Sequence, residues 1–520
     1  MKKISLTFIL IILLILPDRF VHAQSFIQWQ KSYGGTSTEY GYAIDTTNDG
    51  GYIVAGSSFS NDGDVTGNHG NADYWIVKLG STGDIQWQKS LGGTGTENPY
   101  SIEQTTDGGY IVAGSSTSNN GDVTGNHGST DYWVVKLKST GTIQWQKSLG
   151  GSGAEKAYSI QQTADDGYIV AGYSESNEGD VSGNHGNSDI WVVKLDSTGS
   201  LKWQKSLGGS GSDDAFSIQQ TNDRGYIVAG WSSTNDGQVT GNHGSLDYWV
   251  VKLDSTGILL WQKSLGGTSI DEAYAIQQSD DGGYIVAGSS QSNNGDVTGN
   301  HGHEDYWVIK LDSSGTLKWQ KSLGGSYIDQ AYSIKKTADK GCIVAGTTWL
   351  NTGVTISDGD VTGNHGWQDY WVVKLDSTGT LQWQKCYGGS YGDNANSMQL
   401  TGDGGCIVVG STNSNDGDVT AGYGNGDFWV VKLSDVSGIK ESNSSPSILS
   451  IYPNPTYREI TIQTPQTSTI EIFNLEGQIL KTLPNAPPTT TIDVSGLPAG
   501  IWFIKATTEK GTEVRKFIRE

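Results

Sequence analysis

Sulfur and proline are scarce in this chain of 520 residues, which has three cysteines, two methionines and ten prolines. Three cysteines cannot all pair with one another, and their spacing matches no zinc-binding pattern. Cys342 and Cys406 replace the tyrosine of a repeated Gly-Tyr-Ile-Val segment. We therefore expect buried, unpaired thiols rather than a disulfide framework or a metal centre.

Positive charge is also scarce, because 33 Lys and Arg residues face 55 Asp and Glu residues, for a formal net charge of -22. A chain of this charge repels phosphate backbones and anionic lipid headgroups. The composition therefore argues against nucleic acid as a partner and against attachment to an anionic membrane surface.

Long apolar runs are absent except at the start of the chain. Lys2 and Lys3 precede the apolar run 4–16 and Pro17, and Val21-His22-Ala23 then offers small residues for cleavage. This order is typical of a secretory signal peptide, which we assign to residues 1–23. No later run reaches the length of a transmembrane helix, so we expect a soluble, exported chain without a transmembrane segment.

Glycine and aromatic residues are abundant, with 73 Gly, 24 Tyr and 18 Trp. Glycine without a Gly-X-Y period excludes collagen, and this much Trp and Tyr excludes a disordered chain. The combination favours many short strands joined by tight turns.

A repeat organises most of the chain. The motif W-Q-K-[SC]-[LY]-G-G recurs with a spacing of 58 residues, lengthened once to 64, at Trp29, Trp87, Trp145, Trp203, Trp261, Trp319 and Trp383. A fixed period of this size is the signature of a solenoid, propeller or array.

Each period contains four strand-like runs, which in the third copy cover 157–163, 167–174, 189–196 and 200–208. Short Asp-Gly-type connections join the first run to the second and the third to the fourth, which indicates antiparallel hairpins. The mature chain begins with a fourth-type strand, and the last copy supplies only the first three. We therefore predict an all-β fold, a seven-bladed β-propeller over 24–433 that is closed by the N-terminal strand. The two tryptophans of each period are expected to be buried between blades.

The end of the chain departs from the repeat. Residues 434–448 form a polar linker, and 449–520 contain about seven short alternating runs that fit a small Ig-like β-sandwich.

Two families resemble parts of the sequence. Residues 26–433 resemble the bacterial β-propeller repeats of the W-x-K-x-[LY]-G-G type. Residues 449–520 resemble the type A C-terminal sorting domain of the type IX secretion system, through the segments 452–455, 473–477 and 493–500 and the closing Lys516-Phe517-Ile518. This second resemblance implies that 449–520 is an address read by the type IX machinery, which exports the protein through periplasm and outer membrane to the surface or the medium.

Antiparallel order places the two longer loops of each period at one end of the strands, here called the long-loop face. Each period brings carboxylates to this face, and Asp62, Asp64 and Asp73 are the examples in the first copy. Their oxygens around glycine could ligate calcium, the one cofactor that the sequence brings into consideration. Their spacing lacks the EF-hand order, however, and such residues more often cap turns, which is the role we favour. The histidine of each Asn-His-Gly segment is assigned a structural hydrogen-bonding role.

The similarity among the copies breaks down in the sixth, whose long loop carries a six-residue insertion that lengthens the spacing from 58 to 64. The aromatics outside the repeat pattern are then the candidate ligand-binding residues, namely Trp349, Trp367, Tyr327 and Tyr391. Exposed aromatics beside carboxylates and amides suit sugar stacking or protein recognition, although the inserted loop could also pack its own tryptophan.

No Ser-His-Asp or paired-carboxylate arrangement departs from the symmetric background, and we assign no catalytic residue. The sequence predicts a secreted or cell-surface monomer without enzymatic activity that binds a glycan or protein through the long-loop face. The alternatives are a secreted polysaccharide hydrolase or lyase, and a structural surface component.

Overall fold

The computed structural model describes residues 27–350, 358–420, 422–423, 425–434, 449–452, 456–474, 479–498, 500–508 and 511–519. The predicted signal peptide, most of the linker and the tip of the inserted loop lie outside these residues. The chain divides into two compact units, Met1–Gly438 and Ile439–Glu520. The described residues form strands and turns, and none of them belongs to a helix long and apolar enough to cross a bilayer.

The first unit consists of repeated four-stranded antiparallel sheets, as the repeat predicts. The first two sheets are β2 (Glu39–Thr46), β3 (Tyr52–Ser58), β4 (Asp73–Leu79), β5 (Ile85–Leu91), and β6 (Glu97–Gln104), β7 (Tyr110–Ser116), β8 (Asp131–Leu137), β9 (Ile143–Leu149). The next two are β10 (Glu155–Gln162), β11 (Tyr168–Ser174), β12 (Asp189–Leu195), β13 (Leu201–Leu207), and β14 (Asp213–Gln220), β15 (Tyr226–Ser232), β16 (Asp247–Leu253), β17 (Leu259–Leu265).

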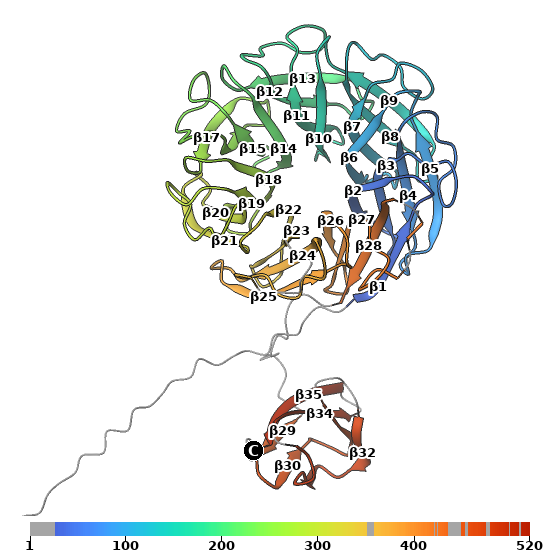
Figure 1. Cartoon of the computed structure of the whole chain (residues 1–520), viewed down its shortest axis with the longest axis vertical. Helices are drawn as coiled ribbons and strands as arrows, with labels where there is room; N and C mark the ends of the chain where they lie inside the picture. Colours follow the sequence, from blue (N-terminus) through green and yellow to red (C-terminus); the bar gives the residue numbers. More distant parts are fainter. Residues whose placement is uncertain are drawn as a thin grey trace, which may run out of the picture. The chain divides into compact units, whose positions relative to one another are not determined.

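The fifth and sixth sheets follow the same order. They are β18 (Asp271–Gln278), β19 (Tyr284–Ser290), β20 (Asp305–Leu311), β21 (Leu317–Leu323), and β22 (Asp329–Lys336), β23 (Cys342–Trp349), β24 (Gln368–Leu375), β25 (Leu381–Tyr387). The sheets stand around a common centre, with the first strand of each period nearest to it (Figure 1).

The seventh sheet joins the two ends of the repeat region. It contains β26 (Asp393–Leu400), β27 (Cys406–Thr412) and β28 (Asp427–Leu433), and its outer strand is the N-terminal β1 (Ile27–Tyr33). Strand β1 pairs antiparallel with β28, from Ile27 opposite Leu433 to Tyr33 opposite Phe428. The N-terminal strand therefore completes a sheet that begins about 370 residues later in the chain, which protects the edge of β28.

Alternation along the third strand of each period joins neighbouring sheets. In β12, Trp191 and Val193 pack with Ala113 and Tyr132 of the preceding sheet. Val192, on the other face of the strand, packs with Val228 of the following sheet. Both faces of such a strand are thus buried, and all seven tryptophans of this position are fully buried. Each one is worth about 3–5 kcal/mol against truncation to alanine.

The tryptophans of the fourth strands are less buried than the sequence predicts. Six of the seven are partly exposed, and only Trp383 is buried. Each lies at the boundary between sheets: the Trp29 ring lies 5.9 Å from that of Tyr52. A Cβ added to Gly83, which has φ 80°, would lie 2.8 Å from the Trp29 indole. The turn glycine is therefore required both for its left-handed backbone and for the close approach of the indole.

The three cysteines are buried and unpaired, as predicted. The second unit forms two antiparallel sheets over a core that includes Ile460, Ile472 and Ile504. Its strands are β29 (Ser450–Tyr452), β30 (Glu459–Gln463), β31 (Ser468–Phe473), β32 (Ile479–Ala486), β33 (Thr489–Asp493), β34 (Gly500–Thr508) and β35 (Gly511–Arg519). The sheet orders are β29-β30-β33 and β32-β31-β34-β35. The segments 453–455 and 475–477, which carry part of the resemblance to a sorting domain, lie outside the described residues.

Candidate functional site

The carboxylates of the long-loop face hold the loops together. The Glu39 carboxylate accepts hydrogen bonds from the Gly35 amide at 2.8 Å and from the Ser58 hydroxyl at 2.8 Å. Burial raises the pKa of Glu39. The same position in later sheets is an aspartate whose pKa burial raises to about 6 in Asp213 and to about 8 in Asp329.

The candidate calcium ligands are engaged separately. Asp62 accepts from the Thr36 amide at 2.8 Å, and Asp64 accepts from the Gly34 amide at 3.3 Å. Asp73 accepts from the His69 amide at 3.0 Å and contacts His69 Nδ1 at 2.5 Å. Within the described ranges, no group of three or more His, Cys, Asp or Glu side chains is arranged to hold a metal ion. The histidines thus occupy the structural hydrogen-bonding role that the sequence predicts for them.

The four candidate aromatic residues lie on segments that run side by side at the end of the sixth sheet. The Trp349 amide donates to the Ile328 carbonyl at 3.0 Å, and the Leu350 amide donates to the Trp367 carbonyl at 3.0 Å. Gln368 then forms an isolated bridge with Gly392, the residue after Tyr391. Four segments distant in sequence therefore form one backbone ladder, and each brings one aromatic residue to the long-loop face.

These side chains are presented to solvent to different degrees. Trp367 is 69% exposed, Tyr391 is 58% exposed and Trp349 is 42% exposed. Tyr327 is half-buried, with its ring 6.2 Å from that of His303. Three of the four candidates are thus open to a ligand of this face. We name the four residues Tyr327, Trp349, Trp367 and Tyr391 the blade-six aromatic patch.

Amide and carboxylate groups accompany the patch. Glu304, itself buried, accepts from Gln330 Nε2 at 2.8 Å and from Gln291 Nε2 at 3.3 Å. The Gln368 amide donates to Asn394 Oδ1. Polar groups of fixed orientation therefore lie on the same segments as the exposed rings.

A second set of aromatic residues, which sequence reasoning missed, follows the innermost strands. Successive ring centroids lie 4.7 to 5.2 Å apart along Tyr42, Tyr100, Tyr158, Phe216, Tyr274 and Tyr332. Asn396 takes the seventh place and donates to the Gly41 carbonyl instead. We name these six rings the aromatic collar. The signal was an aromatic residue three positions after the carboxylate in six of the seven copies.

Two further aromatic residues near the collar were also missed. Tyr173 and Trp231 stand where the second strand of most other copies has serine, and both are half-buried. The Tyr173 ring lies 6.2 Å from that of Tyr158, and Trp231 pairs with Asp214 across the sheet. Burial raises the pKa of Asp214 to about 7. This group lies in the third and fourth sheets, away from the insertion.

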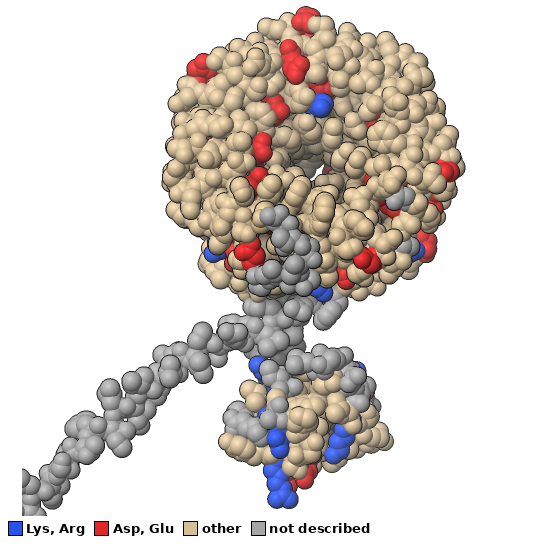
Figure 2. Space-filling model, in the orientation of Figure 1, with Lys and Arg blue, Asp and Glu red and all other residues tan. Residues whose placement is uncertain are grey.

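The centre of the ring is hollow. A cavity of about 260 Å³ is lined by residues of all seven innermost strands, including Glu103 and Lys335. Figure 2 shows the opening, with acidic side chains gathered along one side of it. The cavity is polar, in contrast to the packed sheets around it.

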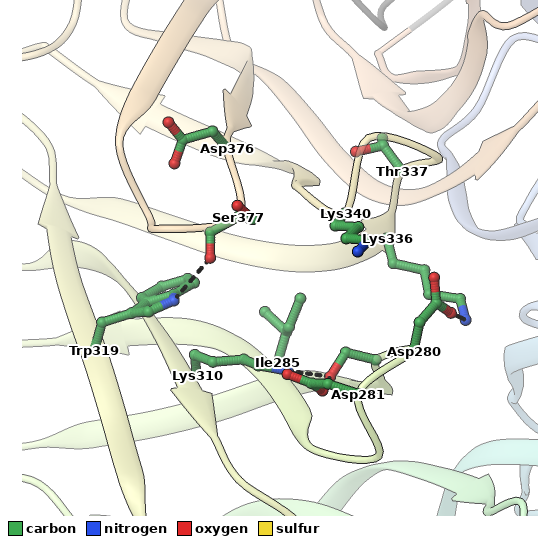
Figure 3. Close-up of a pocket in the computed structure, with 11 residues that line it drawn as sticks. Asp280, Asp281, Ile285, Lys310, Trp319, Lys336, Thr337, Lys340, Asp376 and Ser377 are labelled. Atoms are coloured by element: carbon green, nitrogen blue, oxygen red, sulfur yellow. Dashed lines mark hydrogen bonds and ion pairs between the residues drawn. The ribbon is translucent and has the colours of Figure 1, made fainter.

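A separate pocket of about 230 Å³ lies between the fifth and sixth sheets, at the end opposite to the long loops (Figure 3). Its wall includes Trp319, whose Nε1 donates to the Ser377 carbonyl at 3.3 Å. Its rim carries two ion pairs, Lys310–Asp281 at 2.7 Å and Lys336–Asp280 at 2.5 Å.

Position 342 has a cysteine in place of the tyrosine that most other copies carry there. In five other places the tyrosine at this position packs on the tryptophan of the preceding sheet, as in Trp203–Tyr226 at 5.8 Å between ring centroids. Cys342 is too short to reach Trp319 in the same way. We interpret the pocket as a consequence of this substitution, since four of its six charged groups already pair with one another.

The comparison with known families concerns the C-terminal unit. Residues 450–520 match the family described as the secretion system C-terminal sorting domain. This match confirms the predicted address, so the chain is exported through type IX secretion to the cell surface or the extracellular space. No curated protein matches the chain.

Among solved structures, the extracellular domain of a protein described as a hybrid two-component system of B. thetaiotaomicron matches at 12% identity with a TM-score of 0.40, over 95% of this chain and 59% of that one. PorZ, a surface component of the type IX secretion system of Porphyromonas gingivalis, matches at 10% identity with a TM-score of 0.33, over 91% and 64%. A puromycin hydrolase matches at 12% identity with a TM-score of 0.44, over 84% and 62%. The chain thus spans less than two thirds of each of these proteins, and the likenesses carry no conclusion about its activity.

Proposed function

We propose that this exported chain is a seven-bladed β-propeller, closed by its N-terminal strand and followed by an Ig-like sorting unit of type A, that binds a glycan through its long-loop face. The pairing of β1 with β28 and the packing of Ile44 and Val54 with Ile407 and Val409 support the closure. Each sheet then corresponds to one blade, and the sheet β22–β25 is blade six.

The observation that carries the binding proposal is the blade-six aromatic patch. Its rings come from four separate segments that backbone hydrogen bonds hold side by side, so the backbone positions that carry the rings are fixed before a ligand arrives. Trp and Tyr rings stack on the apolar faces of sugars at a low cost in side-chain entropy, because each has only two side-chain torsions.

The polar groups beside the rings favour a glycan over an apolar partner. Gln330 and Gln368 present amide groups that are already oriented by Glu304 and Asn394. Oriented amides and carboxylates match the hydroxyl groups that alternate around a sugar ring. A flat protein interface would instead need a larger contiguous apolar area.

The role proposed here is binding rather than catalysis. The repeated carboxylates of the long-loop face are engaged with loop amides and histidines of their own periods. A hydrolase or lyase would need two carboxyl groups in unlike roles on either side of a substrate. The buried position of these groups supports a structural assignment.

A glycan array with the purified chain tests this proposal. We expect Trp349→Ala with Trp367→Ala to abolish binding of the glycans that the unaltered chain retains, while the melting temperature stays within about 1 °C because both rings are exposed. The matched control is Phe59→Ala, since Phe59 is 44% exposed and occupies in the first sheet the position that Trp349 occupies in the sixth.

Retained glycan binding by the double variant would refute the patch as the site. Binding to a peptide array but to no glycan would replace the glycan with a protein ligand. Loss of binding in Phe59→Ala as well would show that the whole face, and not blade six, is responsible.

A further inference from the structure

The central cavity contains a ring of seven equivalent side chains, one from each innermost strand. All but one are carboxylates or amides: Asp45, Glu103, Gln161, Gln219, Gln277, Lys335 and Gln399. A lysine in this ring replaces a hydrogen-bond acceptor with a donor. Position 335 therefore breaks the symmetry of this ring of side chains, because its lysine is a hydrogen-bond donor.

The acceptors have a defined task. Five of the six accept the backbone N–H of the residue after the equivalent position in the next sheet: Asp45 from Gln104 at 2.9 Å, Glu103 from Gln162 at 2.7 Å, Gln161 from Gln220 at 2.6 Å, Gln219 from Gln278 at 2.7 Å and Gln277 from Lys336 at 2.5 Å. Five boundaries between sheets are thus closed by the same hydrogen bond.

The boundary after Lys335 has no such bond. Its ammonium group cannot accept from the equivalent amide, that of Leu400, and no side chain in the described part of the chain accepts from this N–H. Lys335 Nζ has no hydrogen bond or ion pair with any described residue, and neither has the side-chain amide of Gln399. Two donor groups that line the cavity, the Lys335 ammonium and the Gln399 side-chain amide, are therefore without an acceptor among the described residues, as is the nearby Leu400 N–H.

Donors in such a place call for an acceptor with several oxygens. A lysine ammonium and a side-chain amide that line the same cavity can both donate to one carboxylate, and hydrogen bonds between charged groups are the stronger kind. The two carboxylates of the ring, Asp45 and Glu103, attract Lys335 from a distance but already accept backbone N–H bonds elsewhere. Burial raises the pKa of Glu103 to about 7, which reduces its negative charge near neutral pH.

The size and walls of the cavity indicate what carries the anion. An apolar cavity of about 150 Å³ admits benzene, so a cavity of about 260 Å³ admits a six-membered ring with a substituent. The aromatic collar contributes Tyr100 to the lining. An aromatic ring at the wall of a polar cavity provides a surface for the C–H face of a sugar.

We propose that the central cavity is a binding site for a carboxylate-bearing sugar residue, whose carboxylate lies against Lys335 and Gln399. The site deepens the proposed glycan-binding function, on which it rests for its biological meaning, by naming an acidic sugar as the bound unit. It is distinct from the blade-six aromatic patch, because it lies at the innermost strands.

Calorimetric titration of the purified chain with galacturonate, galactose and acetate tests this site. We expect galacturonate to bind at least tenfold more tightly than galactose, which lacks the carboxylate, and than acetate, which lacks the ring. Lys335→Gln is expected to weaken galacturonate binding at least tenfold. The same substitution returns the acceptor found at the other boundaries, so the melting temperature is expected to stay equal or to rise.

Lys336→Gln is the matched control, because Lys336 is the next residue but pairs with Asp280 outside the cavity; it should bind galacturonate like the unaltered chain. No binding of galacturonate, equal binding of galactose or acetate, or unchanged binding by Lys335→Gln would each overturn the proposal. The double variant Trp349→Ala with Trp367→Ala should still bind galacturonate, so this site and the blade-six aromatic patch can fail independently.

Discussion

The fourth and sixth sheets are built from the same repeat, but they differ in the residues that they expose at the long-loop face. Both bury their third-strand tryptophan, Trp249 and Trp371, completely. At the long-loop face, however, β14–β17 carries Ser233 and Ser245 where β22–β25 carries Trp349 and Trp367. The strand β23 and the strand β24 are also one residue longer than β15 and β16.

The extra residue in each strand explains how the substitution is accommodated. Trp349 pairs with Gln368, which extends the ladder beyond the position where the regular sheets end. The aromatic residues are therefore carried on strand-like backbone rather than on a free loop. The comparison teaches that positions shared by all sheets hold the ring together, whereas positions specific to one sheet are exposed and available for binding.

The largest effect is expected when a tryptophan at a position common to all sheets, Trp249, is compared with one found only in the sixth sheet, Trp349. We expect Trp249→Ala to lower the free energy of unfolding by about 3–5 kcal/mol, because the indole is fully buried and its Nε1 donates to Gln262 at 2.8 Å. Trp349→Ala should change it by less than about 0.5 kcal/mol, since this ring is exposed. Denaturant unfolding of both variants measures the difference.

Trp249→Phe provides a milder variant in case the alanine variant fails to fold, and it should lie between the two. Equal losses for Trp249→Ala and Trp349→Ala would contradict the division into structural and binding positions.

The repeat region shows what sequence can predict. The period, the four strands and the alternation of Trp191 and Val193 all follow from apolar spacing and turn residues, and the observed sheets agree. Similar copies make each local signal stronger, because a turn residue such as Gly83 recurs in the six periods in which the third and fourth strands are joined by a hairpin. The burial of Cys342 and Cys406 follows from the same reasoning, since both replace a core tyrosine.

The candidate sites show where such prediction ends. Exposed rings such as Trp349 and Trp367 were visible as departures from the repeat. The aromatic collar could not be recognised in this way, because Tyr100 and Phe216 follow the pattern of ordinary strand residues. Their stacking becomes apparent only when the innermost strands are placed around the common centre. Lys335 was likewise overlooked, because its meaning depends on a hydrogen bond between sheets that no single period contains.

The second test concerns Asp213 and Asp329, which occupy the same position in the two sheets. Burial raises the pKa of Asp213 to about 6 and that of Asp329 to about 8, above the value of about 3.9 in an unfolded chain. A carboxyl group whose pKa is higher in the folded than in the unfolded chain stabilises the fold at pH values below its unfolded pKa. This contribution is lost as the pH rises through the folded pKa of the group. The loss therefore ends near pH 6 for Asp213 and near pH 8 for Asp329.

Asp329→Asn should then remove a loss on the order of 2 kcal/mol in unfolding free energy between pH 6 and pH 8. Asp213→Asn should leave this window unchanged and flatten the profile between pH 4 and pH 6 instead. Unfolding curves at each pH measure both profiles, and parallel profiles for the two variants would show that the sheets do not differ in this respect.

The smallest test fills the pocket beside Trp319. Cys342→Tyr restores the ring that Tyr226 supplies in the fourth sheet, where it lies 5.8 Å from Trp203. We expect a gain of about 1 kcal/mol in unfolding free energy, typical of cavity filling, and a correspondingly higher melting temperature. The matched control is Cys406→Tyr, because the facing indole of Trp383 is already buried at 7% exposure and leaves no such space. Overpacking there should cost about 1–3 kcal/mol, so a gain at both positions would mean that the pocket at Trp319 does not arise from the missing tyrosine.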